Sequence, residues 1–469
     1  MEISNILVFL KSIFSFNEAR PLLFTQFYFW AFFAIVFAVF SLIYNRQLLR
    51  SIFLFFVSLF FYFKTSGLFV LMLLFAVVFN FFIGKWIYKA EKKLTKKIAL
   101  TISIIVNLFV LSYFKYAYFF TDIYNNLFHT NNQVINYLAQ WTNTSLHTHF
   151  TVDVILLPVG ISFFTFQIIS YVVDIYRERI EPVKNMMDFG FYVSFFPQLV
   201  AGPIVRANEF VPQIYKKFFL SKRQFGIALF WILNGMIKKM ILSDYLAVNF
   251  IDRVFVNPMM YTGFENLMAL FGYSLQVYAD FSGYTDIAIG VAMLMGFHLP
   301  RNFNSPYKAS NPGDFWKRWH ISLSTWLKDY LYIPLGGNRH ATFATYFVII
   351  AIMLIIVFLA NTYWVTIGIA TLATVLIVAF IVSQRSRKVI NTNLNLMNTM
   401  LLGGLWHGAS WNFMIWGGLN GIGILIYKFW RNINMFYRTG ITFVLFFLFF
   451  IIHDFYPQPI FNIDRIWMG

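Results

Sequence analysis

The chain of 469 residues is 59% apolar and only 12% charged, and 61 of its residues are phenylalanine. A soluble globular protein keeps a larger polar surface, so this composition excludes a soluble class and points to lipid as the solvent. The net charge of +17 does not indicate nucleic-acid binding, because the basic residues fall in short segments between apolar runs, as in loops that orient membrane helices.

Cysteine is absent from the sequence. This excludes structural disulfides, cysteine-ligated metal, palmitoylation and an acyl-cysteine intermediate on this chain. At the N-terminus, apolar residues recur at helical spacing from Ile3 to Phe14 without a small-residue cleavage site after them. The pattern differs from a signal peptide and predicts an amphipathic helix over residues 1–20, either lying on the membrane or packed on the helical bundle.

Apolar runs of about 18 residues or more are long enough to cross a bilayer. Residues 22–44 carry no charge, 51–84 carry only Lys64, and 98–120 carry only Lys115. Further apolar runs lie near 154–173, 189–205, 224–251, 266–298, 343–382, 396–427 and 441–452. We expect an all-α, polytopic membrane protein with roughly ten to twelve crossings and a single domain over residues 1–469.

The charge pattern orients these runs. Residues 85–97 contain six lysines, whereas 121–153 contain no Lys or Arg, so we expect the first segment in the cytoplasm and the second as an extracytoplasmic loop. Residues 189–205 are broken by Pro197, Gly202 and Pro203 and have basic residues on both sides, which predicts a segment that enters the membrane and returns. The 396–427 run also has basic flanks, but its length favours a crossing, so the C-terminal topology stays open.

The stretch "YADFSGYTDIAIG" places Asp280 and Asp286 in an otherwise uncharged run, with Ser282 one turn before Asp286. An unpaired carboxylate is costly in a membrane, so each should meet water, donors or a cation. Candidate cations are Arg206, Arg301 and Lys308. A structural ion pair explains the cluster equally well. The spacing of Asp280 and Asp286 puts them on different faces of a helix, which argues against a catalytic pair unless the helix breaks at Gly283.

The segment "SNPGDFWKRWHISLSTWLKDYLYIPLGG" lies within residues 299–341, which we expect on the cytoplasmic side as an amphipathic region. Asn311 suits a helix N-cap and Pro312 the first helical position. A continuous helix from there places Trp316, Trp319, Trp326 and His320 on the apolar face and the charges on the other. The histidine then points inward, either as a hydrogen-bonded packing residue or as a functional one.

The stretch "LGGLWHGASW" places His407 in about thirty residues without a charge. On a helix, His407 shares a face with Gly403, Gly404, Ser410 and Trp411. The pairs Gly404 with Gly408 and Gly417 with Gly421 are typical of closely packed helices. Close packing explains the glycines but not a histidine at that depth, and an ionisable group inside a membrane is a functional candidate.

No phosphate-binding glycine loop, metal-ligand spacing or nucleophile elbow accompanies these histidines. A histidine base without a Ser or Cys nucleophile suggests direct transfer, in which the imidazole deprotonates an incoming hydroxyl that attacks a donor held beside it. Such a base contributes about 10²–10⁴-fold to a rate. It must be neutral, and an apolar surround disfavours the imidazolium.

At these residues the chain resembles the membrane-bound O-acyltransferase superfamily, and within it the bacterial branch of alginate and peptidoglycan O-acetylating proteins; the D-alanyl transfer protein of teichoic acid synthesis is a more distant relation. The resemblance covers most of the chain in the family's order. It rests on the segments "LPVGISFFTFQIISYVVDIYR" (157–177), "FFPQLVAGPIVR" (195–206), "YADFSGYTDIAIGVAMLMGF" (278–297), "NFNSPYKASNPGDFWKRWHISLSTWLKDYLYIPLGG" (302–337) and "LGGLWHGASWNFMIWGGLNG" (402–421).

The resemblance implies that His320 and His407 are the two catalytic histidines and that His407 lies near the narrow point of a central tunnel. Residues of the matching segments are then expected to line the tunnel or bind substrate: Trp406, Ser410, Trp411, Asp280, Ser282, Asp286, Gln198, Arg206, Asn311 and Trp316. It implies no metal and no permanent cofactor, with acetyl-CoA or another acyl thioester as donor.

The function expected from this resemblance is an O-acyltransferase of the bacterial cytoplasmic membrane, with acetyl as the expected acyl group. It would pass the group to an extracytoplasmic SGNH-hydrolase-like partner that modifies a polysaccharide. Three alternatives stay open: a conduit that moves an acyl carrier without catalysis, a D-alanyl transferase, and a scaffold. A conduit predicts substrate binding without transfer, and a scaffold predicts tolerance of changes at both histidines.

Overall fold

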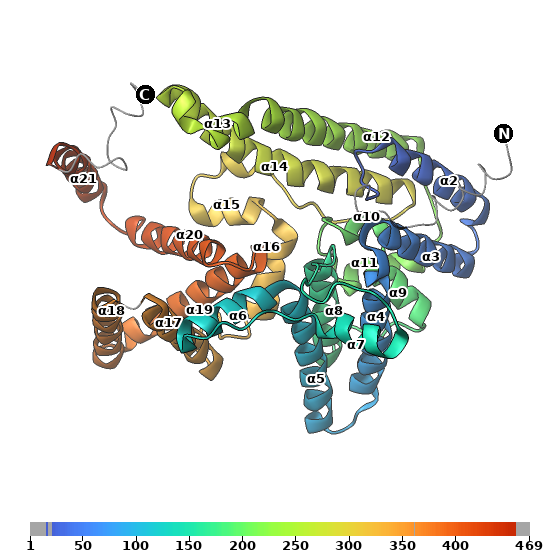
Figure 1. The fold of residues 1–469 in the computed structure, drawn as a ribbon, viewed down its shortest axis with the longest axis horizontal. Helices are drawn as coiled ribbons and strands as arrows, with labels where there is room; N and C mark the ends of the chain where they lie inside the picture. Colours follow the sequence, from blue (N-terminus) through green and yellow to red (C-terminus); the bar gives the residue numbers. More distant parts are fainter. Residues whose placement is uncertain (1–15, 17–20, 361, 456–469) are drawn as a thin grey trace.

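The computed structural model describes residue 16, residues 21–360 and residues 362–455. Within these ranges the regular structure is helical and contains no strand. Figure 1 shows three groups of helices around the short helices α15 and α16, which lie in the middle of the molecule. The expected all-α fold is therefore confirmed. The helix expected over residues 1–20 lies, apart from Phe16, outside the described residues.

The first group forms the aromatic core of the protein. Its buried side chains include tight clusters of phenylalanine, such as Phe191, Phe195, Phe210 and Phe297, whose rings lie 5.1 to 5.6 Å apart between centroids. The helices of this group are α2 (Phe27–Ile43), α3 (Gln47–Ser66), α4 (Val70–Lys89), α5 (Lys93–Leu111), α8 (Ile161–Tyr176), α9 (Met186–Ser194), α10 (Phe196–Leu199) and α11 (Ala207–Ile214).

The second group is a pair of long helical segments, drawn in green to olive-yellow along one edge of Figure 1. Capping boxes at Ser221 and Thr262 begin its two main helices, since each hydroxyl accepts the N–H three residues on. The segments are α12 (Lys222–Ile237), the π-helical stretches η3 (Lys238–Tyr245) and η4 (Ala247–Ile251), α13 (Asp252–Val256), the 3₁₀ turn η5 (Pro258–Met260) and α14 (Gly263–Leu294).

The third group carries the C-terminal quarter of the chain, together with α6 (Ala117–Phe128), which packs on α17. Its other helices are α17 (Phe343–Ala360), α18 (Tyr363–Val382), α19 (Gln384–His407), α20 (Trp411–Trp430) and α21 (Met435–Phe455). The π-helical turn η2 (Ser112–Tyr116) links α5 to α6, and α7 (Tyr137–Leu146) lies beside the first group in Figure 1, where its N-cap Asn136 bonds to Tyr113. Between the groups lie the 3₁₀ turn η6 (Pro306–Lys308), α15 (Pro312–Arg318), α16 (Ile321–Leu327) and the π-turn η7 (Lys328–Tyr332). The predicted extracytoplasmic loop 121–153 thus holds α7 and the end of α6.

Five helical stretches among the described residues are long and apolar enough to cross a membrane: Gln47–Lys89, Lys93–Phe128, Lys222–Val256, Phe343–Ala360 and Tyr363–Val382. Shorter apolar helices are Phe27–Ile43, Ile161–Tyr176 and Met435–Leu448. The run 51–84 is divided by the 3₁₀ turn η1 (Gly67–Phe69), where Gly67 has a φ of 61°. A multi-pass membrane protein follows from these helices, and the number of crossings stays a prediction.

The segment 189–205 consists of short pieces rather than one span. Helix α9 has 9 residues and α10 has 4, and the chain between them turns at Phe195. A helix rises 1.5 Å per residue, so neither is long enough to cross a hydrocarbon core of about 30 Å. All residues from Asp188 to Leu199 are buried by protein, which is the condition under which broken backbone is tolerated at membrane depth.

Candidate active site

His320 lies at a break between two short helices, not within a continuous one. Helix α15 ends at Arg318 and α16 begins at Ile321, with His320 in the left-handed region at a φ of 43°. The predicted continuous helix over this segment is therefore wrong. Asn302 causes the break: it accepts the N–H groups of Ile321 at 2.9 Å and Ser322 at 3.1 Å. These donors would otherwise bond to carbonyls one turn earlier.

The His320 ring is fixed in one orientation. Its Nδ1 accepts the backbone N–H of Leu323 at 3.2 Å, so the imidazole caps α16. A neutral ring that accepts at Nδ1 carries its proton on Nε2. That Nε2 is buried without a hydrogen-bond partner among the described residues. His320 lies outside the candidate spans, and burial lowers the pKa of its imidazole well below its usual range, which keeps the Nε2–H available as a donor.

His407 is the last residue of α19, at the tip of a helical hairpin. The chain is extended at Gly408, and α20 begins at Trp411. Residues 396–427 are therefore not one crossing, and Ser410 and Trp411 do not share a helix face with His407. The sequence pattern missed the break because this run contains no proline. The hairpin brings both basic flanks, Arg385 to Lys388 and Lys428 to Arg438, to the same end, which removes the conflict in the charge pattern.

Glycines allow the two arms of this hairpin to touch. A Cβ added at Gly404 would lie 3.0 Å from the Gly417 Cα, and one added at Gly421 would lie 3.2 Å from the Met400 Cβ. Gly408 is different, because an added Cβ would collide with the ring of Phe413. The small residues thus serve close helix packing, as predicted, but the packed pair is Gly404 with Gly417 across the hairpin.

His407 faces a pocket of about 210 Å³ between α15–η7 and the hairpin. The pocket wall is mostly apolar and includes Trp316, Leu323, Leu327, Met400, Gly403 and Trp416. The imidazole is half-buried, with its ring 5.2 Å from that of Trp416. A continuous tunnel through the protein stays a prediction.

Both histidines contact Trp406: His407 is the next residue of α19, and His320 lies at the break before α16. The centroid of the Trp406 ring system lies 5.8 Å from the His320 ring and 5.0 Å from the His407 ring. Phe281 of α14 lies 4.7 Å from His320 on another side. The indole Nε1 of Trp406, like that of Trp316, is buried without a partner among the described residues. The structure thus brings together four predicted site residues: His320, His407, Trp406 and Trp316.

Asp280, Ser282 and Asp286 lie near Phe281 on α14, and the two carboxylates pair with lysines. Lys238 pairs with Asp286 at 2.6 Å and Lys239 pairs with Asp280 at 2.5 Å. The predicted partners Arg206 and Lys308 are therefore wrong, whereas Arg301 does not pair directly but its charge stabilises the Asp286 carboxylate. Both lysines belong to η3, and the sequence did not reveal that this stretch packs on α14. Helix α14 is unbroken at Gly283, which touches the backbone of Gly235 instead. Ser282 is fully buried, and its Oγ has no partner among the described residues.

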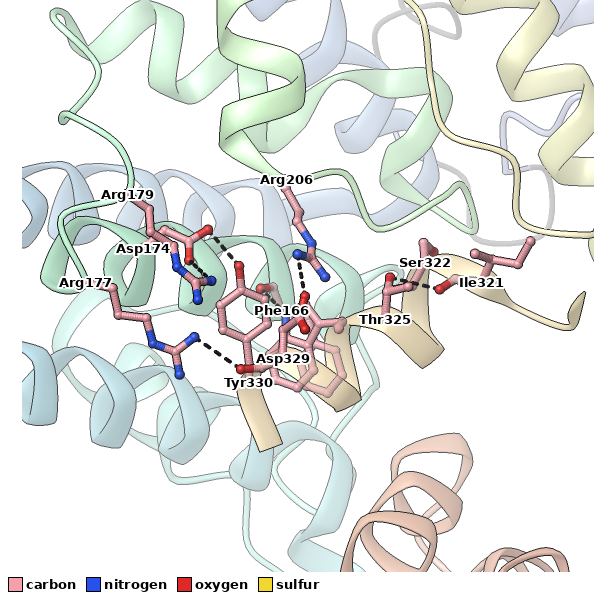
Figure 2. Close-up of polar contacts among 11 residues, drawn as sticks. Phe166, Asp174, Arg177, Arg179, Arg206, Ile321, Ser322, Thr325, Asp329 and Tyr330 are labelled. Carbon is pink, nitrogen blue, oxygen red and sulfur yellow. Dashed lines mark hydrogen bonds and ion pairs between the residues drawn. The ribbon is translucent and has the colours of Figure 1, made fainter. Parts of the chain in front are cut away.

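Arg206 anchors the end of the α15–η7 region. Its guanidinium pairs with Asp329 at 2.7 Å, while Arg177 at the end of α8 donates to the Asp329 backbone carbonyl at 3.1 Å. Figure 2 shows the two arginines approaching η7 from separate elements. Tyr330 donates to Asp174 at 2.7 Å, and burial together with this bond raises the pKa of Tyr330. This cluster holds η7, and through it α16, against α8.

The remaining predicted residues have structural contacts. Gln198 donates to the Tyr192 carbonyl at 2.9 Å, although its Oε1 is buried without a partner among the described residues. Asn311 caps α15 by accepting the N–H of Asp314 at 2.9 Å, as predicted. Ser410 precedes α20 without a side-chain cap, and the Trp411 ring lies 5.2 Å from that of Phe119.

Sequence reasoning missed several neighbours of the histidines. Trp416 lines the pocket, Phe281 touches His320, and Lys115 donates to the backbone carbonyl of Trp406. Only Lys115 carried a signal, as the single charge of its apolar run. In the described part of the chain, no group of three or more His, Asp or Glu residues is arranged to hold a metal ion.

The chain is similar in sequence to proteins of one known family. The model of the membrane-bound O-acyltransferase family matches residues 99–353, a range that includes His320 and ends before His407. A probable alginate O-acetylase of Azotobacter vinelandii is 39% identical over 352 residues, which are 74% of this chain and 57% of the relative. The peptidoglycan O-acetyltransferase of Helicobacter pylori is 33% identical over 410 residues, 82% of this chain and 65% of the relative.

A teichoic acid D-alanyltransferase of Bacillus subtilis is 25% identical over 287 residues, 60% of this chain and 61% of the relative. The chain spans less than two thirds of the length of each of these three curated relatives. Similarity to the two O-acetylating relatives is therefore higher in identity and covers more of this chain than similarity to the D-alanylating one.

Proposed function

Because the chain belongs to the membrane-bound O-acyltransferase family, we propose that it is an O-acyltransferase of a bacterial cytoplasmic membrane. The observation that carries the proposal is the pair of imidazoles in contact with Trp406, one of which faces a pocket. The higher identity to O-acetylating relatives supports acetyl over D-alanyl as the group transferred.

His407 is the proposed general base. It faces the pocket, so an acceptor hydroxyl and a donor can reach its ring. His407 takes the hydroxyl proton while the hydroxyl oxygen attacks the acyl carbon of a thioester. The new C–O ester bond forms, the C–S bond breaks, and the proton passes from the imidazole to the leaving thiolate. A base of this kind contributes about 10²–10⁴-fold.

His320 is the proposed donor to the acyl oxygen. Its Nδ1 is engaged by the Leu323 N–H, so the ring can act only through Nε2. A fixed N–H in a dry surround stabilises negative charge as it develops on the carbonyl oxygen, and removal of one such donor costs on the order of 10²–10³-fold. The two histidines then have different roles: His407 transfers the proton, and His320 donates a hydrogen bond to the acyl oxygen.

The donor and the partners belong to the same proposal. The donor is acetyl-CoA or another acyl thioester, which enters from the side of residues 299–341. The acceptor lies on the opposite side, where 121–153 would face an extracytoplasmic SGNH-like partner that passes acetyl to a polysaccharide. The names of the relatives, alginate O-acetylase and peptidoglycan O-acetyltransferase, support a polysaccharide acceptor. Residues 85–97, with six lysines, support a cytoplasmic turn between α4 and α5.

The test is transfer by the purified chain in liposomes. Labelled acetyl-CoA is supplied with alginate or peptidoglycan fragments and a candidate partner, and base-labile label on the polysaccharide is counted. We expect His407→Gln to lose at least about 10²-fold and the exposed control His298→Gln to retain the wild-type rate. A folded His407→Gln protein with undiminished transfer would remove His407 from the mechanism. A conduit would instead bind donor and pass label across the membrane without forming the ester.

A further inference from the structure

Lys115 lies inside a candidate membrane span but makes no ion pair with a carboxylate in the described part of the chain. A charged group at that depth is costly and needs strong partners. Its Nζ donates to the backbone carbonyl of Trp406 and to the Ser162 hydroxyl at 3.3 Å. The same ammonium lies 5.4 Å from the centroid of the Trp406 ring. Lys115 therefore binds the residue directly before His407.

Tyr116, the next residue, bonds to the same helix end. Its hydroxyl donates to the Leu405 carbonyl at 3.0 Å. Both side chains come from the π-turn η2 between α5 and α6. Short π-helical segments of this kind, inserted in an α-helix, are rare and are frequent at functional sites. The adjacent residues Lys115 and Tyr116 thus donate hydrogen bonds to two adjacent backbone carbonyls, those of Trp406 and Leu405, in the last turn of α19.

These carbonyls need partners from outside α19. The last four C=O groups of a helix have no partner within it, and they form its negative end. Helices often solve this with a left-handed residue whose N–H turns back to them. Helix α19 lacks that solution, because Gly408 is extended at a φ of −162°. The end of α19 is instead closed by an ammonium and a phenol from η2.

We infer that Lys115 is a positioning residue for His407, with Tyr116 as its second support. The bond to the Trp406 carbonyl fixes the last turn of α19, and this turn sets the direction in which the adjacent imidazole faces. Lys115 does not need to touch substrate for this role. The inference rests on the proposed function insofar as it concerns transfer, but the position of the helix end can be measured without any substrate.

The first test is kinetic. Lys115→Met keeps an unbranched side chain, shorter by one atom, and removes the ammonium group with its charge and its donors. We expect kcat to fall roughly 10- to 100-fold, as misplacement of a catalytic group by about 1 Å does, while KM for acetyl-CoA stays within about threefold. Lys115→Arg should recover most of kcat, and Tyr116→Phe should show a smaller loss. Lys89→Met, at the exposed end of a different span, is the control and should retain the wild-type kcat.

The second test separates positioning from general structural damage. If Lys115 acts through His407, Lys115→Met should cause no further loss in a His407→Gln background. A further loss of the same factor, a Lys115→Arg variant no better than Lys115→Met, or a Lys89→Met variant as impaired as Lys115→Met would each overturn the inference.

The third test does not depend on activity. Because the chain has no cysteine, a single Ser410→Cys variant can carry a spin label three residues after His407. We expect Lys115→Met to increase the mobility of this label and Lys89→Met to leave it unchanged. Unchanged mobility in Lys115→Met would contradict the positioning role. Full transfer by His407→Gln would instead reject the proposed function while leaving this measurement valid.

Discussion

The contact between Gly404 and Gly417 allows a sharp test of how the hairpin positions His407. The change is Gly404→Ala, which adds one methyl group one turn before the histidine. This methyl would lie 3.0 Å from the Gly417 Cα and still closer to the carbonyl oxygen of Phe413. Both obstacles are backbone atoms, so a side-chain rotation cannot relieve them. The arms of the hairpin must separate.

The size of the effect follows from these contacts. Ordinary van der Waals contact begins at 3.4 Å, so the arms must separate by about 0.4 Å at Gly417 and by more at the Phe413 carbonyl. Overpacking of this kind costs about 1–3 kcal/mol of stability. The displacement also reaches His407, where a shift approaching 1 Å lowers a transfer rate by up to about 10²-fold. We therefore expect a larger loss in transfer than in folding.

Gly423→Ala is the matched control in the same hairpin. Among the described residues, a Cβ at Gly423 meets only the Pro312 Cγ, at 3.9 Å. This is ordinary contact, and alanine is a better helix former than glycine. Thermal midpoints in detergent and acetyl transfer in liposomes are measured for both variants. We expect Gly404→Ala to be less stable and much slower, and Gly423→Ala to match or exceed the wild type in stability. Equal behaviour of the two variants would refute the account of the hairpin.

Two further predictions concern the left-handed histidine and the buried ion pair. His320→Asn should retain the wild-type thermal midpoint but lose transfer, since asparagine both caps helices and tolerates a positive φ, whereas His320→Ala should lose about 2 kcal/mol of stability as well. Equal midpoints for the two variants would contradict the capping role. Asp286→Asn should cost about 3–5 kcal/mol by leaving Lys238 without its carboxylate, and adding Lys238→Met should restore most of the thermal midpoint. An additive double variant would show that the pair does not interact.

The all-helical fold and the burial of His320 could be predicted from the sequence alone. Apolar runs predict membrane helices because every backbone group in lipid must be bonded within its own segment. One of these runs, residues 396–427, also contains His407 and the glycines that pack the hairpin, whereas His320 belongs to the amphipathic segment 299–341. These features depend on composition and on spacing along one helix, which a single sequence contains.

The helix ends could not be predicted in this way. A periodic pattern continues through His320, and nothing nearby in the sequence indicates that Asn302 takes the N–H groups that would have continued the helix. Similarly, the partners of Asp280 and Asp286 are lysines about 40 to 50 positions earlier, on η3. Both outcomes depend on contacts between segments far apart in the chain, and one sequence without relatives does not reveal these.

The positions of the two histidines have a common physical cause. Each lies at a helix end, His320 before the first turn of α16 and His407 in the last turn of α19. Backbone groups at helix ends lack partners within the helix and must find them on neighbouring segments. Asn302 supplies them for α16, and Lys115 and Tyr116 supply them for α19. A side chain at such an end is therefore oriented by residues that never meet the substrate, so changes at Asn302, Lys115 or Tyr116 should alter transfer more than donor binding.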